Sequence, residues 1–495
     1  MLRSARLSVP FAALVFLAVL VQFTIFAGKA NAQDKSVSNA DQKSASETTK
    51  TKKRKKKKAT AGLPVVVFTQ APMTATPVAV KSIEVMPAAP EPAPARTEVR
   101  ALRSPGVHVS PSGVALLGPS TGPLIISEFR VRGPNGANDE FIELYNNSGA
   151  DHTVAGGGTG YAVAASNGVA RCVVPNGTVI PNRGHYLCVN SVGYSLASYP
   201  AGNGTTATGD ATYTTDIPDN AGIAIFNTSV AVDFTLANRM DAVGSTSEAN
   251  TLYKEGTGYP ALTPFSIDYA FYRDTCGKGG SITTFGACTI STPKDTDNNA
   301  ADFIFVDTNG TSAGAGQRLG APGPENLSSP IQRNASFSVD LLDTCVANSS
   351  PPNRVRDFTS DPANNSTFGT LDIRRTITNN TGGNVTRLRW RVIDITTFPA
   401  PSGIADLRPR TSTAVVVTVD RPPCGSGTSN VTVQGTTLEQ PPSQPNGGGF
   451  NSSLSSGTVT LATPIANGAS LDVRFLLGIQ QTGSFKFFVN VEALP

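Results

Sequence analysis

The chain has 495 residues, of which only 15% are charged, and it contains 47 glycines and 36 prolines. This composition is typical of short strands joined by many turns. It excludes a mainly helical protein or a coiled coil, which needs abundant Ala, Glu, Lys, Leu and Arg. The formal charge of +4 comes from residues 1–58, which carry 13 basic and three acidic residues, so the remainder has a net charge of −6. We therefore expect no basic surface for specific nucleic-acid binding on the folded part.

The N-terminus has the pattern of an export signal. Arg3 and Arg6 precede an almost wholly apolar run at residues 11–28, and the small residues at 30–32 predict cleavage before Gln33. The run of 18 residues is close to the ~20 that span a bilayer, so an N-terminal membrane anchor stays open as the alternative. Either way, the signal predicts a secreted or cell-surface location.

Residues 33–122 are predicted to form a disordered linker. Residues 33–62 are mostly polar and offer little to bury. Residues 63–122 are rich in Pro, Ala and Val, which favours a semi-rigid stalk, with one short strand expected at 65–69. The lysine-rich run at 50–58 predicts salt-sensitive contact with an anionic envelope, and a solvated spacer is the simpler interpretation.

The first folded module is predicted to start at residue 123 and to be an antiparallel β-sandwich. Short apolar or alternating segments follow one another between Gly, Asn and Pro turns, which is the cadence of a sandwich. In the second segment, Ile142 and Leu144 form an apolar face. The expected strands are residues 124–131, 140–146, 161–165, 170–174, 185–189, 222–227 and 230–235.

Parts of this module resemble a known family. The stretch ISEFRVRGPNGANDEFIELYNNSG at 126–149, the D-x-V-G pattern at 241–244 and the segments 295–303 and 320–326 are together similar to the lamin tail domain, in the form found in exported bacterial proteins. The resemblance covers residues 123–330. It implies an immunoglobulin-like sandwich that acts as a surface-attachment or accessory module, sometimes beside nucleases or other hydrolases.

Residues 331–495 are predicted to form a second immunoglobulin-like β-sandwich. A hairpin is expected from residues 370–379 and 385–396, which flank an Asn- and Gly-rich turn. The alternating segments 471–477 and 485–491 predict another hairpin at the C-terminus. The fold class is therefore all-β, with two sandwich domains after the linker.

One strand of the second module alternates apolar residues with arginines. Leu388, Trp390 and Val392 should face the core, which leaves the arginines on the opposite face. Such a row could bind a polyanion such as an acidic polysaccharide, and a solvated face paired with carboxylates is the simpler interpretation. The row consists of Arg387, Arg389 and Arg391.

Six cysteines in an exported chain predict a disulfide framework. We favour pairing of neighbours along the chain, while pairing across modules and free thiols stay open. The first two pairs would close loops of about 12–17 residues, and each would stabilise the fold by ~3 kcal/mol. The favoured pairs are Cys172–Cys188, Cys276–Cys288 and Cys345–Cys424.

Two groups of acidic residues are candidate sites. Paired carboxylates can perform acid–base chemistry or hold a cation. In the first group, however, they match the lamin-tail motif and are expected to be structural; this group consists of Glu128, Asp139, Glu140 and Glu143. Asp295, Asp297 and Asn299 have the 1-3-5 spacing of a calcium loop, but the Gly and Glu of an EF-hand do not follow. A calcium site that includes Asp302 stays open, and a polar turn is the simpler interpretation.

The sequence favours a non-enzymatic exported protein that needs no cofactor and binds an unidentified surface polymer or protein ligand. The glycine–serine pattern at 118–122 lacks the strand and helix of a nucleophile elbow. The alternative is a secreted metal-dependent hydrolase, nuclease-like, with its metal in the inserts at 190–290. His152 and His185 decide between them: either one lying within ~4 Å of two carboxylates in a cleft would favour the enzyme.

Overall fold

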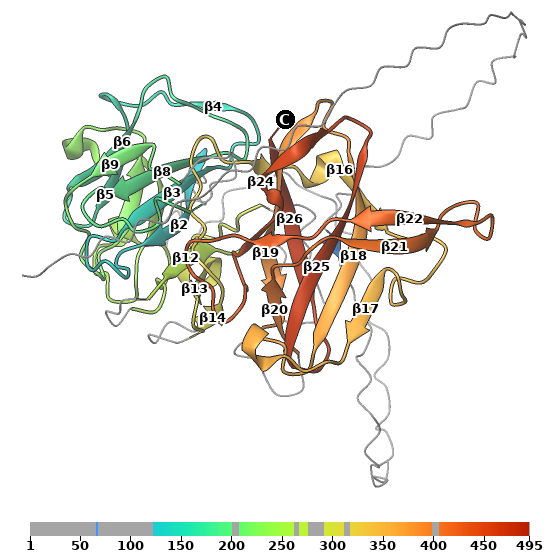
Figure 1. Cartoon of the computed structure of the whole chain (residues 1–495). Coiled ribbons are helices and arrows are strands. Elements are labelled where there is room, and N and C mark those ends of the chain that lie inside the picture. The colour runs from blue at the N-terminus through green and yellow to red at the C-terminus, as the bar shows by residue number, and fades with distance from the viewer. Residues whose placement is uncertain are drawn as a thin grey trace, which may run out of the picture. The chain divides into compact units, whose positions relative to one another are not determined.

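The computed structural model describes residues 66–67, 122–199, 207–261, 267–275, 292–310, 317–397 and 405–494. The export signal, the lysine-rich run, residues 118–121 of the glycine–serine pattern, Cys276 and Cys288 lie outside these residues. The described part is nearly all β (Figure 1), which confirms the predicted all-β class. Its one α-helix, α1 (Asn299–Asp302), has four residues. None of the helices in the described ranges is long and apolar enough to cross a membrane.

The first module contains two larger sheets and a small ribbon. In spatial order, the described part of one sheet contains β14 (Gln317–Leu319), β13 (Phe303–Asp307), β12 (Tyr269–Arg273), β2 (Leu124–Arg130), β3 (Phe141–Asn146), β8 (His185–Asn190) and β9 (Ala211–Tyr213). The other contains β11 (Arg239–Val243), β10 (Ile223–Phe226), β5 (Gly160–Ala165) and β6 (Ala170–Pro175). The ribbon pairs β4 (His152–Thr153) with β7 (Val179–Ile180).

The two larger sheets enclose the first core. Ile126 and Ile142 of one sheet and Val163 and Ile225 of the other belong to a single buried apolar cluster. Alternation along each strand directs these side chains to one face of its sheet. The same alternation in the sequence was the basis for the predicted strand positions, and these agree with the observed ones. The sheets therefore pack as a sandwich.

One predicted strand of this module is wrong. Residues 230–235 do not extend but turn through a short 3-10 helix, η1 (Ala231–Asp233). The ring of Phe234 stacks on Phe226, the last residue of β10, at 4.5 Å, so the chain folds back on itself. Val232 is left 86% exposed, which the apolar run did not indicate.

The second module also contains two larger sheets. In spatial order, the described part of one contains β1 (Val66–Val67), β26 (Phe487–Leu494), β19 (Val385–Ile395), β24 (Ser453–Ile465) and β23 (Thr437–Leu438), with β15 (Ile331–Gln332) also on β26. The other contains β16 (Phe337–Leu341), β18 (Thr370–Asn379), β25 (Ser470–Gln481) and β20 (Asp406–Arg410), with β17 (Arg354–Asp357) on β18. A separate hairpin pairs β21 (Val415–Asp420) with β22 (Thr428–Val433). Of the short strand expected at residues 65–69, Val66–Val67 are described and form β1, which pairs with β26, so this part of the predicted linker joins a sheet.

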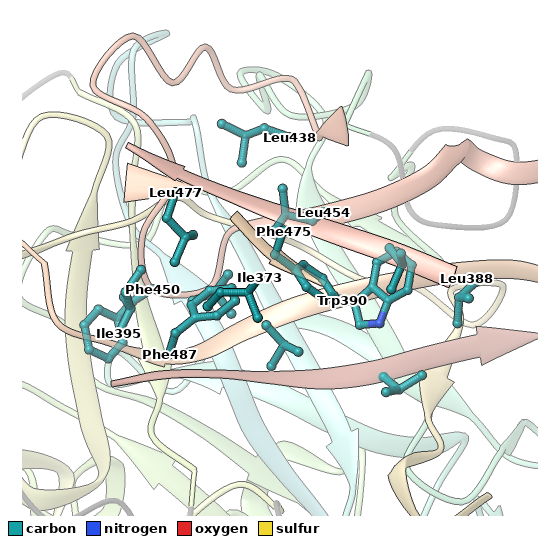
Figure 2. Packing of buried hydrophobic residues seen from close by; sticks show 14 of the residues in the cluster. Ile373, Leu388, Trp390, Ile395, Leu438, Phe450, Leu454, Phe475, Leu477 and Phe487 are labelled. Atoms are coloured by element: carbon teal, nitrogen blue, oxygen red, sulfur yellow. The ribbon is translucent and has the colours of Figure 1, made fainter. Parts of the chain in front are cut away.

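Trp390 lies at the centre of the second core. Its side chain is fully buried, and its ring meets Phe475 edge-on at 5.2 Å. Figure 2 shows these rings packed with Phe487, Leu388 and Leu454 between the strands. Burial of aromatic residues from both sheets stabilises the sandwich.

Both predicted hairpins of this module are wrong. β18 pairs with β16, β17 and β25, whereas β19 pairs with β24 and β26. The chain therefore crosses from one sheet to the other at the turn between β18 and β19, and again between β25 and β26. An alternating strand fits either sheet equally well, so alternation does not select its partner.

The sheet that contains β3 is buried on both faces. Phe141, Leu187 and Val189 point away from the first core and belong to the same apolar cluster as Trp390 of the second module. A backbone bridge joins Gly320 to Phe450. The two modules consequently share an interior, and this interior contains the candidate site.

Candidate functional site

A cavity of about 50 Å³ lies among side chains of β2, β3, β8, β19 and β26. This volume admits a few water molecules but no organic substrate. Its lining is unusually rich in charge for a protein interior. The charged and titratable residues that line it include Glu128, Glu143, Glu325, Glu492, His185, Arg273 and Arg391.

A β-bulge in β2 directs Glu128 toward the cavity. The register between β2 and β3 shifts between Ile126 and Glu128. Ile126 and Phe129 both enter the first core, so the residues between them change face at the bulge. On β3, successive side chains point to opposite faces of the sheet. Ile142 enters the first core, so its neighbour Glu143 points toward the cavity.

Pairing between β19 and β26 brings Glu492 of the second module next to two arginines. Arg389 of β19 lies directly opposite Glu492 of β26. Because Trp390 enters the core, Arg389 and Arg391 project from the other face of β19. Arg391 Nε donates to Glu492 Oε1 at 3.1 Å, and Arg389 Nε donates to Glu492 Oε2.

Glu325 connects the two modules. Its backbone N–H donates to Glu143 Oε2 at 2.7 Å. Its carboxylate lies between two guanidinium groups: Oε1 accepts from Arg389 Nη2, and Oε2 is 3.1 Å from Arg391 Nη2. Glu439 Oε2 adds a further contact, 3.7 Å from Arg389 Nη1. We call these seven residues the buried ionic network: Glu128, Glu143, Glu325, Glu439, Glu492, Arg389 and Arg391.

Glu128 joins this network through an amide and a backbone group. Its Oε1 accepts from the Gly323 N–H and its Oε2 from Asn451 Nδ2, both at 2.9 Å. Arg391 in turn donates to the Asn451 backbone oxygen at 3.1 Å and to its Oδ1 at 3.0 Å. The hydrogen bonds therefore run without interruption from β2 to β19.

Burial perturbs the titration of the network. It raises the pKa of Glu128 to about 7 and, together with the negative charge of Glu128, raises the pKa of Glu143 well above its usual value. Although burial opposes it, Arg391 and Arg389 hold the pKa of Glu492 below its ordinary value. Burial lowers the pKa of His185 to about 3, so the imidazole is neutral at pH 7.

His185 meets the geometric criterion that favours an enzyme. Its Nε2 lies 3.7 Å from Glu143 Oε1 and 3.4 Å from Glu325 Oε2, and its Nδ1 has no hydrogen-bond partner among the described residues. The three side chains each offer a donor atom within 4.8 Å of the others, as a metal site would need.

The chemistry of these donors nevertheless fits a metal poorly. Glu143 Oε1 accepts from the Ser127 hydroxyl at 2.5 Å, and its Oε2 accepts from the Glu325 N–H. Both oxygens of Glu325 already face guanidinium groups, which would repel a cation bound there. The arrangement can hold a proton or a water molecule, and it joins strands of both modules by charge-assisted hydrogen bonds.

The prediction of an exposed arginine row is wrong for Arg389 and Arg391. Their side chains are 0% and 4% exposed, so they cannot contact a polyanion in solution. Alternation alone predicts a solvated face, whereas Glu325 of the first module covers it. Arg387 is half-buried at the end of the same row.

The remaining acidic residues of the first candidate group, Asp139 and Glu140, have structural partners. Asp139 forms an ion pair with Arg130, and both are fully buried. Glu140 accepts from Asn190 Nδ2 at 2.8 Å, and burial raises its pKa to about 8. His152 is partly exposed and stacks on Tyr161, 5.7 Å away between ring centroids.

The calcium-like spacing falls in a polar turn before and within α1. Asn299 Oδ1 accepts from the Gly244 and Glu255 N–H groups, and the Asp302 carboxylate accepts from the Thr296 N–H. Asp295 instead approaches Arg273, with Oδ1 3.3 Å from Nη1. Asn299 and Asp302 therefore hold the turn together.

Two of the three predicted disulfides are confirmed. Cys172–Cys188 connects β6 to β8 across the first core, and Cys345–Cys424 fixes the loop between β21 and β22 to the segment after β16. Such bonds are compatible with an oxidising compartment. The Cys276–Cys288 pair lies outside the described residues.

Glu325, Glu439 and Glu492 were not identified as site residues from the sequence. Only Glu492 carried a usable signal, because it alternates with apolar residues on a strand that could pair with the arginine row.

No family model, no curated protein and no solved structure matches the chain.

Proposed function

We propose that the chain is a non-enzymatic exported protein of the cell surface or extracellular space. In this proposal a lamin-tail-like sandwich and a second immunoglobulin-like sandwich form one rigid unit at the end of an N-terminal linker. The unit binds a surface polymer or a protein ligand, or serves as a structural element of the envelope.

The buried ionic network is the observation that carries this proposal. The residues best suited to catalysis are engaged with one another, and the cavity beside them of about 50 Å³ admits only water. Glu325 bonds to strands of both modules, so the network supports a role in joining them. A rigid two-module unit is what a binding or structural protein needs.

Export is supported independently by the disulfides and by the N-terminal signal. Disulfides persist in oxidising compartments and are rare in the cytosol. The lysine-rich run at 50–58 would add a salt-sensitive contact with anionic envelope material.

Binding to isolated envelope material tests the proposal. We expect the purified chain to bind it and a glycan or protein array to reveal the ligand. Replacing the lysines of 50–58 by serine should remove the salt-sensitive part of the binding and leave the remainder. A chain that is retained in the cytosol, or that binds no envelope component, would refute the proposal.

The geometry at His185 favours one second candidate, a metal-dependent hydrolase. Its group would be Glu143, His185 and Glu325, which lie outside the segment 190–290 where the hydrolase hypothesis places its metal. Incubation of the purified chain with DNA and calcium or magnesium, with and without chelator, separates the two candidates. Metal-dependent cleavage that His185→Ala abolishes would establish the hydrolase, and absence of cleavage would leave the binding protein.

A further inference from the structure

The hairpin of β21 and β22 belongs to neither of the larger sheets of the second module. The two strands pair with each other, and no further strand of the described residues pairs with either one. The hairpin extends outward from the side of the sandwich (Figure 1). The Cys345–Cys424 disulfide fixes the loop at its end to the segment after β16. The hairpin is therefore held in place while one edge of β21 is left without a partner strand.

The free edge of β21 carries backbone groups of two residues. The register with β22 is regular, so backbone groups of successive residues point alternately toward the partner strand and away from it. At the two ends of the hairpin, the Asp420 N–H donates to Asp343 Oδ2 at 2.7 Å, and the Gln434 N–H donates to a backbone oxygen of β25 at 2.8 Å. Residues of this parity therefore point away, which directs the N–H and C=O groups of Val416 and Thr418 outward. No hydrogen bond joins these four groups to another part of the described chain.

The sequence of β21 lacks the features that keep sheet edges from pairing with other chains. Residues 413–419 contain no charged residue, no proline and no glycine. The edge strand β20 differs, because it contains Asp406, Arg408, Pro409 and Arg410. Charges and proline are the usual protection of an exposed edge. The edge of β21 is thus open to another extended strand.

This edge is complementary to a second copy of itself. Two antiparallel copies related by a two-fold axis at Val417 place Val416 of each copy opposite Thr418 of the other. Each such pair exchanges two hydrogen bonds, so the four outward groups of both copies all find partners. The facing residues are uncharged and do not repel one another. The two Val417 side chains, which pack against the apolar cluster of the hairpin, would lie side by side.

We propose that β21 is an interaction surface for a second copy of this chain, and that two chains join their hairpins into one four-stranded antiparallel sheet. Each copy uses the same edge, so the assembly closes as a dimer. The dimer would link two copies of the folded part, which strengthens attachment to a surface with many sites. The inference itself does not depend on the function proposed above.

Sedimentation equilibrium of the full chain tests the proposal between about 1 μM and about 1 mM, where weak interfaces dissociate. We expect a monomer–dimer equilibrium. Thr418→Pro removes one outward N–H from each copy, and therefore two hydrogen bonds from the dimer, so it should weaken association at least tenfold. Asn430→Pro is the matched control on β22. It removes the same 2.8 Å side-chain hydrogen bond between Thr418 and Asn430 and also an outward N–H, but on the other edge, and it should leave the dimer unchanged.

A cysteine at the two-fold axis tests the pairing without changing the backbone. The two copies of residue 417 would form a non-hydrogen-bonded pair with a Cα separation of about 4.5 Å, which permits a disulfide. Oxidised Val417→Cys should therefore run as a covalent dimer, and Thr432→Cys, exposed on β22, should cross-link at least tenfold less.

Four results would overturn the proposal. They are a wild type that stays monomeric at all concentrations, a Thr418→Pro variant that folds and dimerises like the wild type, an Asn430→Pro variant that folds but no longer dimerises, and equal cross-linking of the two cysteine variants. Growth into larger assemblies would overturn the closed two-fold pair. If Thr418→Pro does not fold, as circular dichroism would show, the cysteine variants decide.

Discussion

Replacing Arg389 by methionine tests the buried ionic network directly. Arg389 is fully buried and contacts Glu325, Glu439 and Glu492. Methionine keeps the apolar stem of the side chain but removes the charge. Glu492 would lose the partner opposite it on β19 and keep only Arg391.

The expected loss follows from the titration of Glu492. Arg391, the stronger of the two cations that lower the pKa of Glu492, remains in the variant, so the largest possible loss at pH 7 is that of protonating this buried carboxyl, starting from an ordinary pKa of 4.5. At 1.36 kcal/mol per pH unit this amounts to about 3 kcal/mol, which agrees with the roughly 3–5 kcal/mol for breaking a buried ion pair. At pH 5 the same calculation leaves less than about 1 kcal/mol.

Urea unfolding at pH 7 and pH 5 measures this difference. Arg421→Met is the matched control, because Arg421 is 41% exposed and its 2.9 Å pair with Asp472 is on the surface, where such pairs contribute about 0–1 kcal/mol. The double variant Arg389→Met with Glu492→Gln should lose less than the sum of the single variants. Equal losses for Arg389→Met and Arg421→Met, or a loss independent of pH, would refute the reasoning.

Three further predictions concern the whole fold. Burial raises the pKa values of Glu128 and Glu439 to about 7, so the folded chain holds protons that the unfolded chain releases near 4.5, and stability is lost as pH rises through this window. Together these two groups should lower the unfolding free energy, measured in urea, by about 3 kcal/mol from pH 6 to pH 8. Glu140, whose pKa burial raises to about 8, adds to this fall, and the lowered pKa of His185 acts oppositely only below pH 6.5. A rise over this range would contradict the prediction. Trp390 is the only tryptophan of the chain and is fully buried, so its emission should be blue-shifted and resist iodide until the second module unfolds; rapid quenching in the folded protein would contradict its position. Serine at both positions of Cys172–Cys188, 16 residues apart, should lower the unfolding free energy by about 3 kcal/mol, and a change below 1 kcal/mol in calorimetry would contradict a role in joining the two sheets.

Strand positions could be predicted from the sequence because their signal is local. β2, β3, β5, β6, β8 and β10 all lie within about one residue of the expected ranges, because turn residues mark their ends. The apolar run at 230–235 is the exception. The chain turns back through η1 there, and Phe234 stacks on Phe226 of the strand just before it.

Strand partners could not be predicted in the same way. The segments that became β18 and β19 alternate correctly and flank a good turn, yet they lie in different sheets. Whether two successive strands form a hairpin or lie in different sheets depends on which distant strands they pair with. A pattern of period two contains no information about these partners.

The candidate site shows the same limit at the level of single residues. Alternation correctly placed Arg389 and Arg391 on the face opposite Trp390. It did not indicate that this face would be covered, because the covering residues belong to the first module, among them Glu325, which is 64 positions before Arg389. His185 and Glu325 likewise lie 140 positions apart in the sequence, and only folding brings them within 3.4 Å.

The buried ionic network is better explained by specificity than by stability. An apolar layer of similar volume is often as stable as a buried ion pair. Much of the contact between the modules is already apolar, because Phe141 of the first and Trp390 of the second belong to one apolar cluster. Charges add directionality: Glu325 must meet the Glu143 carboxylate with its N–H and both arginines with its side chain. A shift of β19 by one residue would direct Trp390 toward the first module and leave buried carboxylates without donors. We infer that the network selects one register between the modules, which is why charged residues persist where hydrophobic ones would pack.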